Sequence, residues 1–251
     1  MILEQIALGD KDVYSSSKIG SYDKCPLQYY LNYIKKIKVD EYEDPEITTL
    51  GKIYHKIAEL YQDGMDIEAL AKESFEKYDL SFSNKNKKTM ENIENIKVYK
   101  DKIFDRKKSG EIIFIEEEKD IRFDFGAYSV RGYIDLLYAD QYGYHIIDYK
   151  TSQTQGDDRH IRQMLLYILM VKETIAKDMD ISHITSRVFY VKLGKLSKIF
   201  MMNPHTYDIF KYSLYDKIAN IRSSHKFPAK PTFMCSWCQY NHTENCPLTL
   251  Q

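Results

Sequence analysis

The sequence predicts an α/β fold: a mixed β-sheet flanked by helices, with a helical N-terminal region and a cysteine-rich C-terminal cap. Three consecutive segments near the middle of the chain are rich in β-branched and aromatic residues, which is typical of strands. The segments before and after them carry apolar residues at spacings of three and four, which is typical of helices that bury one face. The order is helices, three strands, a helix, two strands and a helix, and it predicts a sheet with helices packed against it.

The first hundred residues are predicted to be helical. A first helix is expected to begin after an N-cap at Ser17 and to be kinked or restarted at Pro26. A second helix is predicted over 49–62, where apolar residues form a stripe on one face. The polar run 81–89 predicts a loop, and a further helix is expected to end before Gly110.

Three strands connected as hairpins are predicted in the middle of the chain. They cover 111–125, 128–138 and 144–151, and turn residues separate them at Gly126 and at 140–143. Because side chains alternate between the two faces of a strand, residues two apart in these segments are expected to project to the same side.

The last third of the chain returns to helix and then to strand. A helix is predicted over 158–177, followed by strands over 184–193 and 196–202 that share a turn at Gly194, and by a helix over 204–223.

One domain is predicted over 1–251, because this length is enough for a single buried core. Within it we distinguish a helical part over 1–110, a central part over 111–225 and a cap over 226–251. The cap differs in composition: it contains prolines, the one tryptophan and three of the four cysteines.

The bulk charge does not by itself indicate a partner. The net charge is −1 and the pI about 6.7, which neither predicts nor excludes a nucleic-acid binder, because local charge matters more than the sum. The lysine clusters at 35–38, 85–88 and 106–108 and the glutamates at 116–118 are predicted to be solvated surface. No apolar run is long enough to cross a bilayer, and the N-terminus does not resemble a secretory signal, so no membrane association and a cytoplasmic location are expected.

Two aspartates and a lysine form the most informative pattern in the chain. Asp148 and Lys150 lie two apart in a predicted strand and so share one face, and Asp135 lies on the preceding strand of the same hairpin. Two carboxylates can hold a hard divalent cation such as Mg²⁺ or Mn²⁺, and a nearby lysine can stabilise the transition state of phosphodiester hydrolysis. The alternative is a surface ion pair between Asp148 and Lys150, worth under about 1 kcal/mol.

Four short motifs occur in one order along the chain. They are Gly51-x-x-x-His55, Gly132-x-x-Asp135, Asp148-x-Lys150 and Gln163-x-x-x-Tyr167. Together they resemble the motifs of the RecB-like branch of the PD-(D/E)XK nuclease superfamily, over about residues 14–250. The resemblance implies a restriction-endonuclease-like fold and a metal-dependent nuclease.

The resemblance also implies roles for individual residues. His55, Asp135 and Asp148 would be metal ligands, together with the backbone carbonyl of Tyr149, and Lys150 would be the catalytic lysine.

The helix after the lysine strand carries the last motif. Gln163 and Tyr167 share one helix face because they are four residues apart, and the resemblance implies that they position the DNA backbone or the active-site groups. Arg159, one turn earlier, could contact a phosphate. Without the other motifs, His55 and Tyr167 would be interpreted as core residues.

The four cysteines are Cys25, Cys235, Cys238 and Cys246. Disulfides are not expected in a cytoplasmic protein. A zinc site could use the last three cysteines with His242. The segment 22–29 around Cys25 resembles the first-cysteine motif of the iron–sulfur subset of this family, which includes AddB-type nucleases and CRISPR adaptation nucleases. This resemblance implies a [4Fe-4S] cluster held by all four thiolates.

The predicted function is therefore that of a metal-dependent DNA nuclease. The resemblance implies single-stranded DNA ends as substrate, exonuclease activity, and a setting in recombination, repair, phage DNA processing or CRISPR adaptation. No nucleotide-binding motif of a helicase occurs in the chain, so a helicase, recombination or CRISPR adaptation protein is a potential partner. The alternatives are a structure-specific endonuclease or RNA-acting enzyme, a non-catalytic DNA-binding subunit of a helicase–nuclease complex, and a zinc-stabilised protein without nuclease activity.

Overall fold

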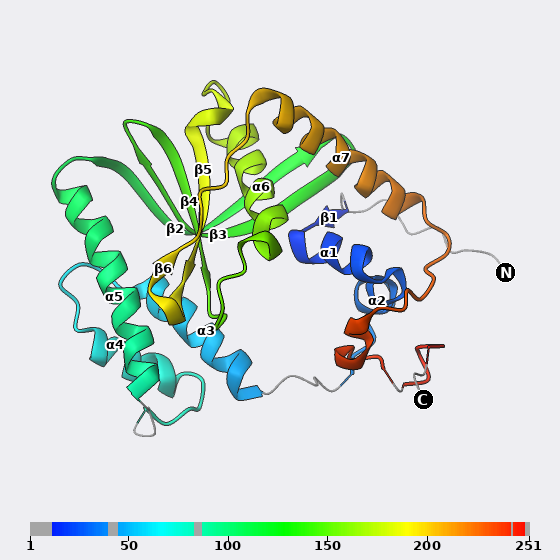
Figure 1. Cartoon of the computed structure of the whole chain (residues 1–251), viewed down its shortest axis with the longest axis horizontal. Helices are drawn as coiled ribbons and strands as arrows, with labels where there is room; N and C mark the ends of the chain where they lie inside the picture. The colour runs from blue at the N-terminus through cyan, green and yellow to red at the C-terminus, as the bar shows by residue number, and fades with distance from the viewer. Residues whose placement is uncertain (1–11, 40–44, 83–86, 242, 249–251) are drawn as a thin grey trace.

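The structure is a computed structural model that describes residues 12–39, 45–82, 87–241 and 243–248. A mixed sheet occupies its centre, and helices cover both faces (Figure 1). The helices are α1 (Ser16–Lys24), α2 (Pro26–Tyr29), α3 (Pro45–Leu60), α4 (Ile67–Glu76), α5 (Lys87–Lys108), α6 (Asp157–Thr174) and α7 (Pro204–Ser223). The strands are β1 (Val13–Tyr14), β2 (Ile112–Phe125), β3 (Tyr128–Asp140), β4 (Gly143–Lys150), β5 (Ile184–Tyr190) and β6 (Lys195–Leu196). The predicted α/β fold with a mixed sheet is confirmed.

The sheet combines a three-stranded meander with a parallel crossover. Strands β2, β3 and β4 pair antiparallel in chain order, as the turn residues predict. Strand β5 pairs parallel with β4, and α6 makes the crossover between them. The short β6 pairs antiparallel with β5, and β1 pairs parallel with β3.

One edge of β3 is only partly paired. Strand β2 pairs along almost the whole length of β3, so β1 and β4 share the other edge. On that edge β4 pairs only as far as Leu136, and β1 pairs at Ser129 and Val130. Residues 131–135 lie between these two pairings, and Asp135 is the last of them.

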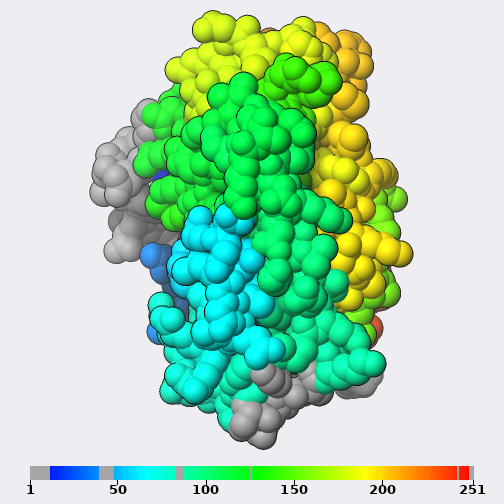
Figure 2. Space-filling view, turned by 90° about the vertical axis from the view of Figure 1, so that its left-hand side faces the viewer, coloured from blue at the N-terminus to red at the C-terminus, as the bar shows by residue number. Residues whose placement is uncertain are grey.

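The buried residues form two hydrophobic cores, one with α6 and one with α5, and these helices lie on opposite faces of the sheet (Figure 1). The α6 core includes Ile168 of α6 and Ile134 of β3, whereas the α5 core includes Ile96 of α5 and Leu136 of β3. Figure 2 shows the outside of the α5 face, with the cyan segment of α3 and α4 packed beside the teal segment of α5. A regular strand would place Ile134 and Leu136 on the same face, so β3 changes face at Asp135.

Strand β2 is irregular at the same level. Glu117 pairs with Leu136 and Lys119 pairs with Ile134, and the ladder skips the pair between them, Glu118 and Asp135. Glu118 has a φ of 47°, a left-handed conformation that costs a non-glycine residue about 1–3 kcal/mol. Two adjacent strands thus depart from regular geometry at one point, and that point carries two carboxylates.

The N-terminal helix begins two residues earlier than predicted. Its N-cap is Ser15, whose hydroxyl accepts a hydrogen bond from the Lys18 N–H at 3.2 Å, while Ser17 lies inside the first turn. The predicted restart at Pro26 is present: Cys25 is extended with a φ of −157°, and Pro26 is the first residue of α2. Cys25 therefore sits in a break between two helices.

The predicted strand over 196–202 is wrong beyond its first residue. The regular pairing is interrupted at Ser197. Its hydroxyl accepts the N–H of Val188 at 2.9 Å, and its carbonyl accepts two hydrogen bonds from the Arg187 guanidinium, at 2.6 and 2.9 Å. The segment still follows β5, since Phe200 forms a bridge with Ser186, but it does not form a regular ladder. The predicted strand over 184–193 likewise ends early, at Tyr190, where a 3₁₀ turn follows.

The cap lies against the N-terminal helices, as the red and blue segments of Figure 1 show. The Leu27 N–H donates to the Pro228 carbonyl at 3.3 Å, and the Tyr240 hydroxyl and the Gln239 amide both donate to the side chain of Asn32. The two ends of the described chain are thus connected directly. Among the described helices, none combines the length and the hydrophobicity needed to cross a bilayer.

Candidate active site

Asp148 lies near the carboxyl end of β4 and is 2% exposed. The Lys150 Nζ atom lies 2.6 Å from its Oδ2 atom, and the Gln163 Nε2 donates to its Oδ1 at 3.0 Å. Burial raises the pKa of Asp148 to about 6; Lys150 opposes this rise and Asp135 adds to it. The carboxylate of Asp148 is therefore buried, and its partner Lys150 is partly exposed, so the pair is not the surface ion pair of the alternative interpretation.

Asp135 lies beside Asp148, at the point where β3 and β4 separate. The last pair of the ladder is Leu136 with Ile147, so the next position on each strand is an aspartate. Beyond it the backbone pairing is replaced by a side chain, because the Asp135 Oδ2 accepts the N–H of Tyr149 at 2.5 Å. The Tyr149 ring is 1% exposed in the α5 core, which fixes the backbone at this position.

His55 approaches the two strands from α3. Its Nδ1 atom lies 3.5 Å from the Asp135 Oδ2, and its ring meets the Tyr149 ring edge-on at 6.2 Å between centroids. Ile53 and Ile57 of α3 are fully buried in the α5 core, and His55, two residues from each, projects from another side of the helix. Burial alone would lower the pKa of His55, but Asp135 and Asp148 outweigh it and raise that pKa.

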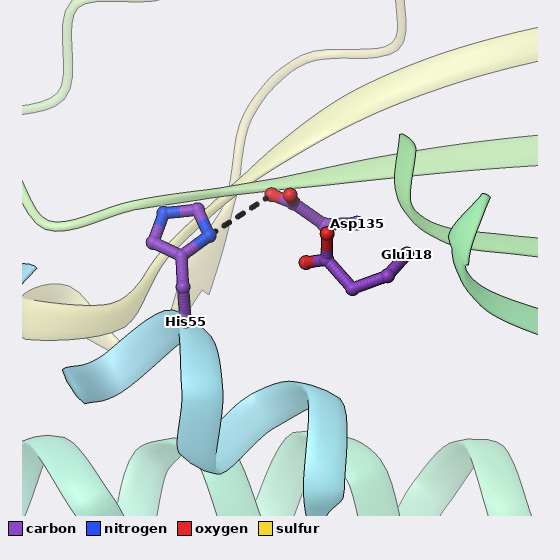
Figure 3. A group of neighbouring side chains, drawn as sticks. All are labelled: His55, Glu118 and Asp135. Carbon is purple, nitrogen blue, oxygen red and sulfur yellow. Dashed lines mark ion pairs between the residues drawn. The ribbon is translucent and has the colours of Figure 1, made fainter. Parts of the chain in front are cut away.

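Glu118 completes a group that the sequence did not predict. A nitrogen of His55 and carboxylate oxygens of Glu118 and Asp135 all lie within 4.8 Å of one another. Figure 3 shows the three side chains pointing toward one another from α3, β2 and β3. Burial, with Asp135 as a further cause, raises the pKa of Glu118, as expected for a buried carboxylate beside another one.

The prediction that residues 116–118 form a solvated strand segment is therefore wrong for two of the three glutamates. Glu118 faces His55 and Asp135, and Glu117 forms a buried ion pair with Lys100. A signal was available, because three consecutive residues of a strand cannot all face solvent when helices cover both faces of the sheet.

The group meets the requirements of a divalent cation. Its donors are carboxylate oxygens and one imidazole nitrogen, which suit Mg²⁺ or Mn²⁺. The buried carboxylates of Asp135 and Asp148 lie next to each other, with the Lys150 ammonium group beside Asp148 and the His55 ring beside Asp135. A divalent ion would balance the remaining negative charge.

Gln163 and Tyr167 project from α6 toward Asp148. The Gln163 Nε2 donates to the Tyr167 hydroxyl at 2.9 Å as well as to Asp148. Burial raises the pKa of Tyr167, so its hydroxyl stays protonated at neutral pH. The Tyr167 ring lies against Gly132, where an added Cβ would come within 2.8 Å of Cε1, so no larger residue fits at position 132 without displacing the ring.

A groove of about 1210 Å³ lies beside this cluster. Its walls come from α1 and α2, from β3 and from α6, and its lining includes Lys150, Gln163 and Tyr167. Arg159, for which a phosphate contact was predicted, also lines the groove; its guanidinium folds back and donates to the carbonyl and hydroxyl of Thr154 at 3.4 and 3.2 Å.

The four cysteines gather at the junction of the cap and the N-terminal helices. All four are free thiols, and Cys25 accepts a hydrogen bond from the Lys230 N–H at 3.4 Å. Burial raises the pKa of Cys238, and Cys246, Cys25 and Cys235 add to this rise, so the other three cysteines lie near Cys238. His242, the fourth ligand of the alternative zinc site, lies outside the described residues.

Comparison with protein families identifies the chain. A model of the PD-(D/E)XK nuclease superfamily matches residues 13–243. The chain belongs to this superfamily. Membership implies phosphodiester hydrolysis, and PD-(D/E)XK nucleases typically use divalent metals such as Mg²⁺. The restriction-endonuclease-like fold that the motifs predict is that of this superfamily, and the mixed sheet with flanking helices is consistent with it.

Two solved structures are similar to this chain at low sequence identity. The crystal structure of a "putative exonuclease" from Eubacterium rectale is similar with a TM-score of 0.54 and 10% identity, and the match covers 99% of this chain and 96% of that one. The crystal structure of SSO0001 matches with a TM-score of 0.42 and 12% identity, over 96% and 89% of the two chains. No curated protein matches the sequence.

Proposed function

We propose that this PD-(D/E)XK protein is a metal-dependent deoxyribonuclease with Asp135, Asp148 and Lys150 at its catalytic centre. The observation that carries the proposal is the convergence of two buried carboxylates with Lys150 and His55 at the point where β3 and β4 separate. An isolated buried carboxylate is costly unless it is paired or binds a cation, so two adjacent ones point to a cation site.

The metal ligands in this proposal are His55, Asp135, Asp148 and the Tyr149 carbonyl, with Glu118 added from the structure. A bound divalent cation would supply Lewis acidity toward a phosphate oxygen and a water of lowered pKa. The side chain of Lys150 lines the groove next to Asp148, where its ammonium group can stabilise negative charge on a phosphate.

Gln163 and Tyr167 are proposed to hold Asp148 in its orientation. The amide of Gln163 donates to both partners, which fixes the plane of the Asp148 carboxylate. Hydrogen bonds of this kind orient the ligands of metal sites and raise metal affinity or activity by about 10–100-fold. Both residues line the groove and can therefore also contact a bound strand.

We further propose that the enzyme is an exonuclease acting on the ends of single-stranded DNA. The motif resemblance supports this, and so does the name of the Eubacterium rectale protein. The same resemblance supports action in recombination, repair, phage DNA processing or CRISPR adaptation, alone or with a helicase or CRISPR adaptation partner. We propose a cytoplasmic location and one nuclease domain over 1–251, in which 1–110 supplies His55 and Cys25.

The four thiols are proposed to hold a [4Fe-4S] cluster. Thiolates at this junction would join residue 25 to the cap and so close a loop around the domain, which makes the role structural. Zinc is the alternative, and a tetrahedral zinc site holds its sulfurs about 3.8 Å apart, given bonds of about 2.3 Å.

Substitution of Asp148 tests the catalytic proposal. We expect Asp148→Asn to lower Mg²⁺- or Mn²⁺-dependent degradation of end-labelled single-stranded DNA by about 10²-fold or more, because a neutral amide cannot balance a divalent cation. The matched control is Asp216→Asn, which changes an exposed aspartate on α7 and should leave the rate unchanged. Undiminished degradation by Asp148→Asn would contradict the proposal, and thermal melting verifies that both variants fold.

The form of the substrate separates the remaining alternatives. An exonuclease degrades linear single strands and leaves circular ones intact, whereas an endonuclease cuts both. An RNA-acting enzyme degrades an RNA strand of the same sequence. A non-catalytic DNA-binding subunit binds the linear strand without degrading it at any metal concentration.

A further inference from the structure

The groove beside the candidate site contains an aromatic side chain that the proposed mechanism does not use. We propose that Tyr133 is a stacking platform for a base of the substrate strand and that the groove accepts a single DNA strand and not a duplex. The inference rests on the proposed nuclease function, since it concerns how the strand reaches Lys150.

Tyr133 is unusually exposed for its place in the fold. It lies in the middle of β3, where Ile134 is fully buried, yet 49% of its own surface is exposed and it lines the groove. It is two residues from Asp135, or about 7 Å along the strand. No described residue hydrogen-bonds its hydroxyl. The ring is therefore available to a ligand in the groove that Lys150 also lines.

The ring of Tyr133 is held in place before any ligand binds. The guanidinium of Arg131 lies 5.2 Å from the ring centroid, and Arg131 is itself fixed by two hydrogen bonds to Asp120, at 2.8 and 2.6 Å. A cation over an aromatic face stabilises the position of both groups. Stacking of a base on Tyr133 would thus cost less conformational entropy, because the side chain is already ordered.

The charge of the groove suits a nucleic-acid backbone. Although the whole chain has a net charge of −1, the lining contains five basic side chains and two carboxylates. The basic residues are Lys24, Arg131, Lys150, Arg159 and Arg162. Among the described residues, Lys24 has no ion-pair partner, so it can meet a phosphate without breaking a contact.

Stacking on Tyr133 selects for a single strand. Sites for single-stranded nucleic acid combine a basic track with aromatic side chains on which bases stack. In a duplex both faces of each internal base are already covered by its neighbours, so no internal base has a face free for Tyr133. The combination of a half-exposed ring, a basic lining and a neighbouring phosphodiesterase site is what a single strand requires.

Binding measurements in EDTA test this inference apart from cleavage. The probe is a labelled single-stranded DNA of about 12 nucleotides, within the site sizes of such proteins. We expect Tyr133→Ala to raise the Kd by about 5- to 150-fold, the range for loss of one base–aromatic stack, and Tyr133→Phe to leave it unchanged. The control is Tyr212→Ala, which removes a 71% exposed tyrosine on α7 and should not affect binding.

Salt and duplex controls separate stacking from charge. The slope of log Kd against log salt should stay the same in Tyr133→Ala, whereas Lys24→Ala should reduce it by about 0.7, the value for one phosphate contact on a single strand. A duplex of the same sequence should bind Tyr133→Ala and the unmodified protein equally.

If Tyr133→Ala binds the strand like Tyr212→Ala, the stacking inference is wrong, and the nuclease proposal still stands on Asp148→Asn. If Tyr133→Ala loses binding but the unmodified protein never degrades DNA, the nuclease proposal fails and the binding groove stands.

Discussion

Asp148 and Glu118 are both acidic, but different surroundings place them in the site. Asp148 is held by Gln163 and Lys150, residues that the motifs predicted. The position of Glu118 results from the left-handed conformation of its own backbone, and from the point on the neighbouring β3 where the strand changes face. A strained residue beside the proposed metal ligands indicates that the strain serves the site.

Glu118 can be tested without an activity measurement. We expect Glu118→Gln to weaken Mn²⁺ binding by about 10–100-fold, because the amide loses the charge that a divalent cation requires. Direct titration of the protein with Mn²⁺, by calorimetry or by loss of the free-ion signal, gives the affinity. Glu116→Gln is the matched control, two residues away on the same strand. Equal affinities for the two variants would remove Glu118 from the ligand set.

The pair of Gln163 and Tyr167 is best tested by a double-mutant cycle. We expect Gln163→Ala to lower kcat by about 10–100-fold, as loss of a hydrogen bond to a metal ligand does. Tyr167→Phe removes a hydroxyl that touches Gln163, so it should add little in the Gln163→Ala background. Gln141→Ala, in the exposed turn between β3 and β4, serves as the control. Independent, additive effects would show that the two residues do not act together.

At the scale of elements, a buried lysine connects three of them. Lys100 of α5 is fully buried, pairs with Glu117 of β2 and donates to the Ala58 carbonyl of α3 at 2.8 Å. Burial lowers the pKa of Lys100 and raises that of Glu117, which is the expected direction when both charged forms are desolvated. The contact holds α3, which carries His55, against the strand that carries Glu118.

Removal of one partner of this pair should lower the stability of the fold considerably, whereas removal of both partners should lower it much less. We expect Lys100→Met to lower the free energy of unfolding by about 3–5 kcal/mol, because the Glu117 carboxylate would stay buried without a cation. The double variant Lys100→Met with Glu117→Leu should recover most of this loss. Urea unfolding of the four proteins in the cycle gives the values. A single variant as stable as the unmodified protein would mean that the pair is solvated.

At the scale of the whole molecule, the cap packs against helices α1 and α2 of the N-terminal part. Cys25 lies in the break that Pro26 makes between α1 and α2, and the cap with the other three cysteines packs there. A linkage through these thiols closes a loop of more than two hundred residues, so it should stabilise the domain largely by restricting the unfolded chain.

If the four thiols hold a cluster, loss of one thiol should lower the iron content and the thermal stability together. We expect Cys246→Ala to lose both bound iron and the absorbance near roughly 400 nm that iron–sulfur proteins show, and to melt at a lower temperature. Anaerobic purification, metal analysis and thermal melting measure the three. Ser236→Ala, inside the same cap, is the control. Full iron content with an unchanged melting temperature would contradict a site built from four thiolates, and bound zinc would support the alternative.

The local signals in the sequence predicted the elements well, because they act through nearest neighbours. The alternation in the three central strands, the turn residues between them and the break at Pro26 all lie within a few residues of the structure they specify. Helix α4 was missed as a separate element. The strand after Gly194 was predicted to be too long, because the Ser197 hydroxyl accepts the Val188 N–H, and the pattern of apolar residues does not reveal that hydrogen bond.

By itself, the sequence determined the fold class and the superfamily motifs. It also determined that Asp135, Asp148 and Lys150 lie close together, since strand alternation and a short hairpin are enough to place these three residues. Tertiary structure alone decided that Glu118 joins His55, that Lys100 is buried against Glu117, and that Tyr133 is exposed in a basic groove. These arrangements depend on helices packing on both faces of the sheet and on a face change shared by two strands. Such contacts are set by the packing of distant segments, and no local spacing encodes them.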